Sequence, residues 1–257
     1  MIYTEKTYKH LLFCGDIHGN ENLIPNFIRD QELDTCAVFQ AGDFGIGFEE
    51  KHKDDKWLKY INKRMDHTNS DLFVVRGNHD DPAYYDGNTV LSNVRLMKDY
   101  EVININGWNV LGVGGAVSVD RTDRTSWWWH NADKEKKGLN DWWKDEGVDF
   151  QEEILIELRD IDIVVTHSAP HFCMPITKGN IKRWLAKDEN LDMDVAIERH
   201  LLTRIYGILK ENNSISEWYY GHFHMNSKNY EGKTTFTALD IDKIVPSNKL
   251  YNYDDTE

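Results

Sequence analysis

Aspartate, histidine and asparagine recur in this sequence directly after short apolar runs. Five such clusters occur, and they contain Asp16 and His18; Asp43; Asn78, His79 and Asp80; His167; and His222 and His224. Most of them lie beside a glycine, which lets the backbone turn sharply and approach a ligand closely. Carboxylate, imidazole and amide oxygen together suit Mn, Fe, Zn or Ni better than Ca. The clusters hold enough ligands for two ions, and two ions about 3.5–4 Å apart can hold the attacking and leaving oxygens of a displacement at phosphorus.

Six further histidines lie outside these clusters: His10, His52, His67, His130, His171 and His200. A single histidine in a loop or on a helix is most often solvated or structural, and we interpret this group in that way. His171 follows His167 closely, so it is the member of the group that could also face the site.

Each cluster follows a run that predicts a β-strand, and in an open α/β sheet ligands bind at the carboxyl ends of the strands. The predicted strands are residues 10–14, 35–40, 71–75, 161–165 and 216–220. Helical patterns over about residues 20–30 and 49–66 separate the first three strands. This order predicts βαβ connections and a largely parallel sheet.

The pattern changes after a turn-rich loop at residues 81–93. Short strands are expected at 94–97, 100–105 and 108–112, and Asn106-Gly107 between the last two is a strong hairpin signal. We interpret this part as antiparallel and as the beginning of a second sheet. Two helices, 150–160 and 191–212, and a hairpin within 230–238 complete the expected elements. The apolar stripe of the longer helix is expected at Leu191, Val195, Leu201, Ile205 and Ile208.

Residues 118–150 form an unusual segment within an expected single domain over residues 1–257. They contain five of the nine tryptophans, Trp127, Trp128, Trp129, Trp142 and Trp143, together with Arg121 and Arg124. One interpretation is a surface excursion whose tryptophans pack on the body or on a partner. The other is a lid beside the site, in which arginines bind phosphate and aromatic rings stack on a base.

Composition limits the classes of function. There are 44 acidic and 30 basic side chains, a formal charge of −14, which opposes binding to long nucleic acid. Residues 1–10 are polar and lack a signal-peptide apolar region, and no apolar run approaches the ~20 residues of a membrane span. Cys14, Cys36 and Cys173 show no CxxC spacing and are expected to be reduced thiols, with Cys14 and Cys36 buried. We therefore expect a cytoplasmic protein without a membrane partner.

In chain order the clusters read Asp-x-His, Gly-Asp, Gly-Asn-His-Asp, Thr-His and Gly-His-x-His, from Asp16 to His224. This series resembles the calcineurin-like metallophosphoesterases. The resemblance implies an α/β fold of two packed mixed β-sheets flanked by helices. It also implies two divalent metal ions, Mn first and Fe, Zn or Ni as alternatives. The implied ligands are Asp16, His18 and His224 for one ion and Asn78, His167 and His222 for the other, with Asp43 bridging both.

The resemblance also implies catalytic roles. His79 would face the substrate as general acid, oriented by Asp80. The residue types fit this chemistry, because a hydroxide shared by two metals is a ready nucleophile for in-line attack and an imidazole can protonate the leaving oxygen near neutral pH. Arg76 precedes the cluster, and its guanidinium either binds two phosphate oxygens or forms a structural ion pair.

Two departures argue against a protein serine/threonine phosphatase. The Gly-Asp block at Asp43 continues as Phe-Gly and lacks the Asp-Arg-Gly of that branch, and Asp80 stands where that branch has Glu. The stretch Gly114-Gly115-Ala116-Val117-Ser118-Val119-Asp120, with the arginines and tryptophans after it, resembles a segment of small bacterial and phage metallophosphoesterases.

Three functions follow from these observations. The first is hydrolysis of a phosphomonoester or small phosphodiester, with a nucleotide-like substrate preferred because the Trp/Arg segment could stack a base. The second is a nuclease or cyclic-nucleotide phosphodiesterase. The third is an inactive metal-binding scaffold, which is disfavoured because every ligand block and His79 are present.

Overall fold

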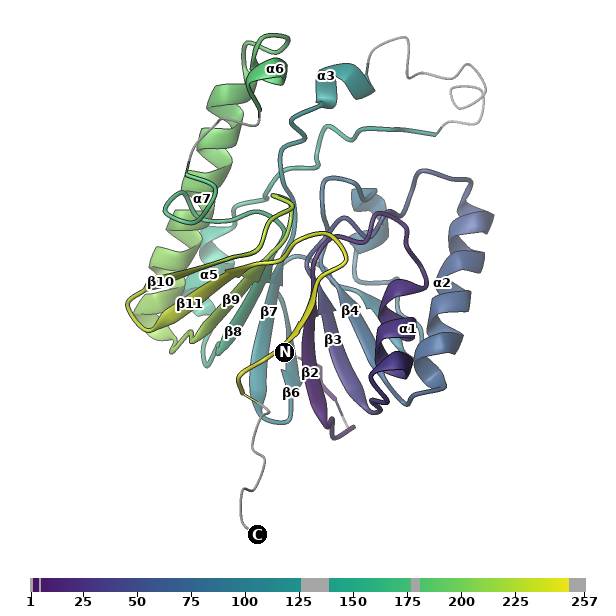
Figure 1. Ribbon diagram of the computed structural model, residues 1–257. Coiled ribbons are helices and arrows are strands. Elements are labelled where there is room, and N and C mark those ends of the chain that lie inside the picture. The colour runs from purple at the N-terminus through teal and green to yellow at the C-terminus, as the bar shows by residue number, and fades with distance from the viewer. Residues whose placement is uncertain (1, 5, 126–138, 177–180, 250–257) are drawn as a thin grey trace.

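The computed structural model describes residues 2–4, 6–125, 139–176 and 181–249 (Figure 1). One sheet has five strands in the order β12-β2-β3-β4-β5. These are β12 (Ile244–Pro246), β2 (His10–Cys14), β3 (Cys36–Gln40), β4 (Asp71–Val74) and β5 (Val94–Leu96). The other has seven strands in the order β1-β6-β7-β8-β9-β11-β10. These are β1 (Ile2–Tyr3), β6 (Glu101–Ile105), β7 (Trp108–Val113), β8 (Ile163–Thr166), β9 (Glu217–Tyr220), β11 (Thr234–Ala238) and β10 (Ser227–Glu231).

Both sheets are mixed, as expected for two packed mixed sheets. Strands β2 to β5 run parallel and β12 pairs antiparallel with β2, while β7, β8, β9 and β11 run parallel in the larger sheet. The Asn106-Gly107 turn joins β6 and β7 as the predicted antiparallel hairpin. The interpretation of residues 94–97 was wrong in one respect: β5 does not join the antiparallel portion but extends the first sheet in parallel with β4.

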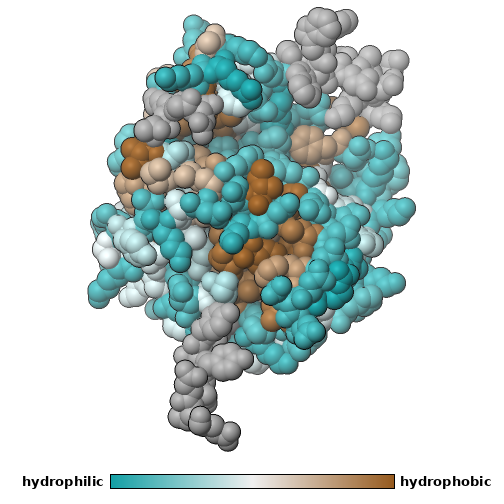
Figure 2. Space-filling view, viewed as in Figure 1, coloured by the Kyte–Doolittle hydropathy of each residue, from teal (hydrophilic) through white to brown (hydrophobic). Residues whose placement is uncertain are grey.

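Helices cover the outer faces of the two sheets (Figure 1). Helices α1 (Leu23–Asp30) and α2 (Lys51–Asp66) cover the five-stranded sheet, and α5 (Glu152–Glu157) and α7 (Leu191–Asn212) cover the seven-stranded sheet. The short helices α3 (Arg121–Arg124) and α6 (Lys182–Leu185) and the 3₁₀ turn η1 (Pro82–Tyr85) lie in the connections. Figure 2 shows the outer surface of α2, at the right of the view, as hydrophilic, which agrees with its amphipathic pattern.

Strand alternation explains how the layers hold together. Successive side chains of a strand point to opposite faces. Leu11 and Phe13 of β2 therefore enter the core between the two sheets, while Leu12 and Cys14 enter the core beneath α1 and α2. Across the inter-sheet core the rings of Phe13 and Tyr219 stack with centroids 3.7 Å apart. These contacts fix the position of one sheet relative to the other, and so the position of the loops at their ends.

Two helices differ from their sequence patterns. Helix α5 is shorter than expected because the backbone of Leu158 is already extended. In α7 the fully buried apolar side chains are Leu191, Leu202, Ile205, Tyr206 and Leu209, whereas Val195 lines a cavity. The second half of α7 packs on the seven-stranded sheet. Leu191 and Ile205 of the predicted stripe are buried, but Leu201 and Ile208 are only partly buried, because the neighbouring Leu202 and Leu209 face the core instead.

Cys14, Cys36 and Cys173 are buried free thiols, as expected. Among the described residues, none of the helices combines the length and apolar content that a bilayer crossing requires.

Candidate metal centre

The seven expected metal ligands meet where strand ends of both sheets converge. Asp16 and His18 follow β2, Asp43 follows β3 and Asn78 follows β4, all in the parallel part of the five-stranded sheet. His167 follows β8, and His222 and His224 follow β9, in the parallel part of the seven-stranded sheet. Neighbouring parallel strands present their carboxyl ends at one edge, which places these loops together.

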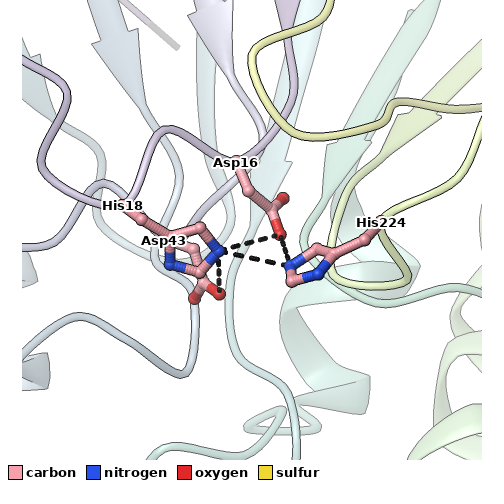
Figure 3. A group of neighbouring side chains, drawn as sticks. All are labelled: Asp16, His18, Asp43 and His224. Carbon is pink, nitrogen blue, oxygen red and sulfur yellow. Dashed lines mark hydrogen bonds and ion pairs between the residues drawn. The ribbon is translucent and has the colours of Figure 1, made fainter.

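The first group of ligands is partly open to solvent. We call Asp16, His18 and His224 the outer ligand set. Figure 3 shows their side chains and that of Asp43 pointing toward one another. His18 Nε2 lies 3.2 Å from His224 Nε2 and 3.9 Å from Asp16 Oδ2, and His224 Nε2 lies 3.1 Å from Asp16 Oδ2. One ligand atom from each of these four residues fits within 4.8 Å of the others, which is a suitable size for one metal ion.

The second group, Asn78, His167 and His222, forms the inner ligand set. His167 Nδ1 lies 2.7 Å from the carbonyl oxygen of Ala41, which can only accept, so Nδ1 carries the proton. In a neutral imidazole Nε2 is then an acceptor, yet it lies 3.0 Å from Asn78 Oδ1 and 3.1 Å from Asp43 Oδ1. Three acceptors facing one another repel unless a cation or an added proton lies among them. The inner set therefore fits a metal ion.

Asp43 joins the two sets. One of its carboxylate oxygens lies 3.1 Å from His167 Nε2, and the other lies 3.9 Å from His18 Nε2. The backbone N–H of His79 donates to the first oxygen at 2.7 Å, which fixes the rotation of the carboxylate. With one oxygen toward each set, Asp43 has the geometry of a bridging ligand.

The orientation of Asn78 depends on residues that we did not identify from the sequence. Asn78 Nδ2 donates to Ser118 Oγ at 2.9 Å, which leaves its Oδ1 facing His167. Ser118 Oγ in turn donates to Glu146 Oε2 at 2.6 Å, and the Ser118 N–H donates to Glu146 Oε1 at 2.7 Å. Ser118 lay in the recognised stretch 114–120, but no pattern connected Glu146 with the site. This chain of hydrogen bonds determines which amide atom of Asn78 the site receives.

The backbone is strained at the ligands. His18, Asp43, His222 and His224 have φ values of +43°, +56°, +65° and +46°, which non-glycine residues rarely adopt. Strain of this kind persists where the surroundings enforce it, and it clusters at functional sites. Close packing adds to it, because a Cβ on Gly42 would collide with His167 Nδ1 and one on Gly221 with Asp16 Oδ1.

Buried charged side chains dominate the electrostatics of the site. Burial opposes the charged form of His167, but Asp43 and Asp16 outweigh it and raise its pKa to about 10. Burial likewise favours the neutral form of Asp43, but His167 and His79 hold the pKa of this carboxyl well below its usual range. Burial and the neighbouring His167 lower the pKa of His222 well below its ordinary value. The proton on His167 thus occupies the role that a metal ion would take.

The three residues expected to act in catalysis have different surroundings. His79 lines the cavity beside the ligands, with its ring centroid 5.1 Å from that of His18, and burial lowers its pKa. Asp80 accepts hydrogen bonds from the backbone N–H groups of Gly45 and Gly77, each at 2.7 Å, and so ties together the loops after β3 and β4. We therefore assign Asp80 to the loops rather than to orientation of the His79 ring.

Arg76 makes the structural ion pair that was one of its two interpretations. Its side chain is almost fully buried, Nη2 lies 3.1 Å from Asp99 Oδ2, and the guanidinium also donates to the carbonyl oxygens of Glu146 and Gly147. Its nitrogens are thus bound to protein oxygens. The contacts favour the ion pair over phosphate binding.

A cavity of ≈ 560 Å³ opens at the ligands. Asp43, Asn78, His79, His222 and His224 line one end of it. His171, which we expected could face the site, lines it, and so does His200, which is solvent-exposed as expected for that group.

The Trp/Arg segment lies only partly within the described residues, because Trp127, Trp128, Trp129 and His130 are outside them. Trp143 is buried, with its ring edge-on to Phe48 at 5.0 Å. Arg121 pairs with Asp188 and Asp194, each at 2.6 Å, and Arg124 Nη1 donates to Ser118 Oγ. In the described part Trp143, Arg121 and Arg124 contact the body, as in the first interpretation, while Val119 and Asp120 of the same segment line the cavity beside the site, as in the second.

Comparison with solved structures finds distant similarities. The chain is similar in structure to GAP50, the anchor in the inner membrane complex of Plasmodium, with 13% identity, 90% of this chain and 71% of that chain covered and a TM-score of 0.41. For phosphopantetheinyl hydrolase from Mycobacterium tuberculosis the identity is 14%, the coverage 91% and 90%, and the TM-score 0.40. Among curated proteins no sequence matches the chain.

The profile of the calcineurin-like phosphoesterases matches residues 9–226. That stretch runs from β2 to just beyond His224 and includes every residue of both ligand sets. The chain therefore belongs to the calcineurin-like phosphoesterase family and is a metal-dependent phosphoric ester hydrolase.

Proposed function

We propose that this protein hydrolyses a small phosphomonoester or phosphodiester with two divalent transition-metal ions, with Mn²⁺ as the first choice and Fe, Zn or Ni as alternatives. The observation that supports two ions is Asp43, whose carboxylate oxygens face two separate groups of acceptors. Bound there, the cations would offset the charge of the phosphate and lower the pKa of the attacking water.

The protein's own residues supply position and a proton. His79 is held by its backbone N–H on Asp43 and has its ring in the cavity, where it can reach a leaving oxygen. Burial lowers its pKa, but a bound phosphate anion favours the imidazolium and opposes that effect. His79 is therefore suited to donate a proton to the leaving alcohol when substrate is bound.

A metal-dependent activity screen tests this function. Metal-stripped protein would receive Mn²⁺, Fe²⁺, Zn²⁺, Ni²⁺ or Mg²⁺, with para-nitrophenyl phosphate and bis-para-nitrophenyl phosphate assayed in parallel. We expect turnover that requires an added metal and is highest with Mn²⁺. Dominant monoester turnover would indicate a phosphatase, and dominant diester turnover would favour the nuclease or phosphodiesterase alternative.

His52→Asn on the solvent face of α2 serves as the control, because its side chain is 75% exposed and is not among the described residues that line the cavity at the ligands. It should match the wild type with every metal. Two bound ions without turnover of either ester would contradict the proposal and favour the inactive scaffold.

A further inference from the structure

The cavity at the metal centre continues well beyond the metal ligands. Its far part is formed by the segment after β8, by α6 and by the first half of α7. We call this part the organic half of the cavity, and its main side chains are Trp184, Phe223, Ile176, His171 and His200. We infer that it binds a nucleoside, so that the substrate is a nucleoside monophosphate. This inference rests on the proposed function, because it assigns the leaving group of that reaction.

Trp184 offers a surface for stacking. The guanidinium carbon of Arg183 lies 3.8 Å from the centre of its ring and so covers one face. Trp184 also lines the cavity, so part of its indole surface is available to a ligand there. Base–aromatic stacking tolerates any base because every base has a π-face. Phe223, between two metal ligands in sequence, adds a second aromatic wall.

His171 offers a hydrogen-bond acceptor. Thr203 Oγ1 donates to the carbonyl oxygen of Arg199 at 2.9 Å, so toward His171 it can only accept. His171 Nδ1, 2.8 Å from this oxygen, is therefore the protonated nitrogen. In the neutral imidazole Nε2 is then an acceptor, on a ring that lines the cavity. An exocyclic amino group or a sugar hydroxyl is the kind of donor that it would bind.

Charge in the organic half favours one phosphate and a neutral leaving group. Arg199 is the one Lys or Arg among the described residues that line the cavity, and its guanidinium donates to the carbonyl oxygens of Pro170 and Cys173 at 2.9 and 2.6 Å. The acidic side chains Asp120 and Glu198 line the same space. A second phosphate would meet carboxylates and an already occupied guanidinium. A planar, uncharged ring with polar edges, as in a nucleoside, fits these walls better than a diphosphate.

The test compares two phosphomonoesters in the Mn²⁺-loaded protein. Adenosine 5′-monophosphate carries a base, and glycerol 2-phosphate does not. We expect kcat/KM to favour the nucleotide by at least about tenfold, as one base–aromatic stack allows. Trp184→Ala should reduce this preference by about tenfold, mainly through KM for the nucleotide, and Trp184→Phe should restore most of it. Tyr230→Ala, at a 74% exposed aromatic side chain on the β10 hairpin, should leave the preference unchanged.

A binding measurement separates this inference from the proposed function. Equilibrium dialysis with adenosine needs no turnover, and we expect binding by the wild type that Trp184→Ala weakens. Hydrolysis of both esters without preference and without adenosine binding would overturn the nucleoside assignment while leaving the phosphoesterase intact. Adenosine binding without hydrolysis of either ester would uphold the subsite and overturn the proposed function. An equal loss for both substrates in Trp184→Ala would make Trp184 structural and contradict its role in specificity.

Discussion

In the outer ligand set the His18 and His224 side chains are 32% and 45% exposed, whereas in the inner set His167 is fully buried. Two of the three inner side chains are fixed by further partners: Ala41 holds His167, and Ser118 with Glu146 holds Asn78. The ring nitrogens of His18 and His224 contact each other, Asp16 Oδ2 contacts both rings, and Asp43 contacts His18.

This difference predicts that the two ligand sets bind their metal ions with different affinities. Partners behind a ligand reduce its freedom and typically strengthen metal binding. We therefore expect the inner set to bind its ion more tightly and the outer set to exchange its ion with solvent. His224 of the outer set lines the cavity, and so do Asn78 and His222 of the inner set, so we expect substrate in the cavity to reach both sets.

The largest expected effect comes from removing the carboxylate of Asp43, which both ligand sets share. Asp43→Asn replaces a bridging carboxylate with a neutral amide, which can no longer offset the charge of two cations. We expect metal content to fall from two ions per chain toward none, and activity to be abolished, as measured by elemental analysis and ester hydrolysis. Asp55→Asn on α2 is the matched control. Two ions retained in Asp43→Asn would show that the sets do not depend on a common ligand.

His79→Asn should separate chemistry from metal binding. We expect both ions to remain and kcat to fall about 10²–10⁴-fold, because the leaving oxygen loses its proton donor. The loss should be greatest for phenyl phosphates with poorly acidic leaving groups, which a series of substituted esters would measure. Metal content falling to zero in this variant would contradict the assignment of His79 as general acid.

Ser118→Ala should weaken one set selectively. The substitution frees the Asn78 amide to rotate, so affinity for the inner ion is expected to fall about 10–100-fold while that for the outer ion changes little. Calorimetric titration of the metal-free protein with Mn²⁺ would resolve the two events. Ser92→Ala, whose hydroxyl bonds to Asn62 and Asn93 elsewhere, is the control. If Ser118→Ala lowered the affinity for both ions equally, the proposed difference between the inner and outer ligand sets would be contradicted.

The smallest expected effect is on the pH dependence of stability, through the buried residue Glu198 near the inner set. Glu198 accepts a hydrogen bond from Val117, and burial raises the pKa of its carboxyl from 4.5 to about 7. The folded state then binds a proton more readily than the unfolded state between these values, so this residue makes stability fall as pH rises from about 4.5 to about 7. The loss is at most about 3 kcal/mol above pH 7.

Glu198→Gln keeps an acceptor and removes the titration. In metal-free protein we expect it to melt above the wild type at pH 8, by at most roughly 6–12 °C, and to converge with the wild type toward pH 5. Glu153→Gln, on the exposed side of α5, should melt with the wild type at every pH. If the difference in melting temperature between Glu198→Gln and the wild type did not change with pH, the protein interior would stabilise the charged carboxylate of Glu198 and the prediction would be wrong.

The convergence of the expected ligands was predictable because all seven follow one of five strand ends. Asp16, Asp43 and Asn78 follow apolar runs closely. In a parallel sheet the carboxyl ends of neighbouring strands lie at one edge, which brings these residues together. The sequence did not predict the hydrogen-bond partners of Asn78 or the residues of the organic half of the cavity. Glu146 and Trp184 reach the site through contacts between distant segments, which leave no periodic trace in the sequence. Trp184 also lies in an ordinary Lys-Arg-Trp-Leu helical turn, while the dense tryptophans of residues 127–129 directed the interpretation elsewhere.

The convergence of strand ends from both sheets has a mechanical consequence. Asp16, His18, Asp43 and Asn78 belong to one half of the molecule, and His167, His222 and His224 belong to the other. An ion bound among them would act as a cross-link over the seam between the halves. An ion that binds only the folded state adds about 4 kcal/mol at a thousand times its Kd. A chelator would then remove the stabilisation between the two halves of the molecule as well as stop the reaction. During synthesis, the ligands of the first half would lack the histidines of the second half until the second sheet had formed.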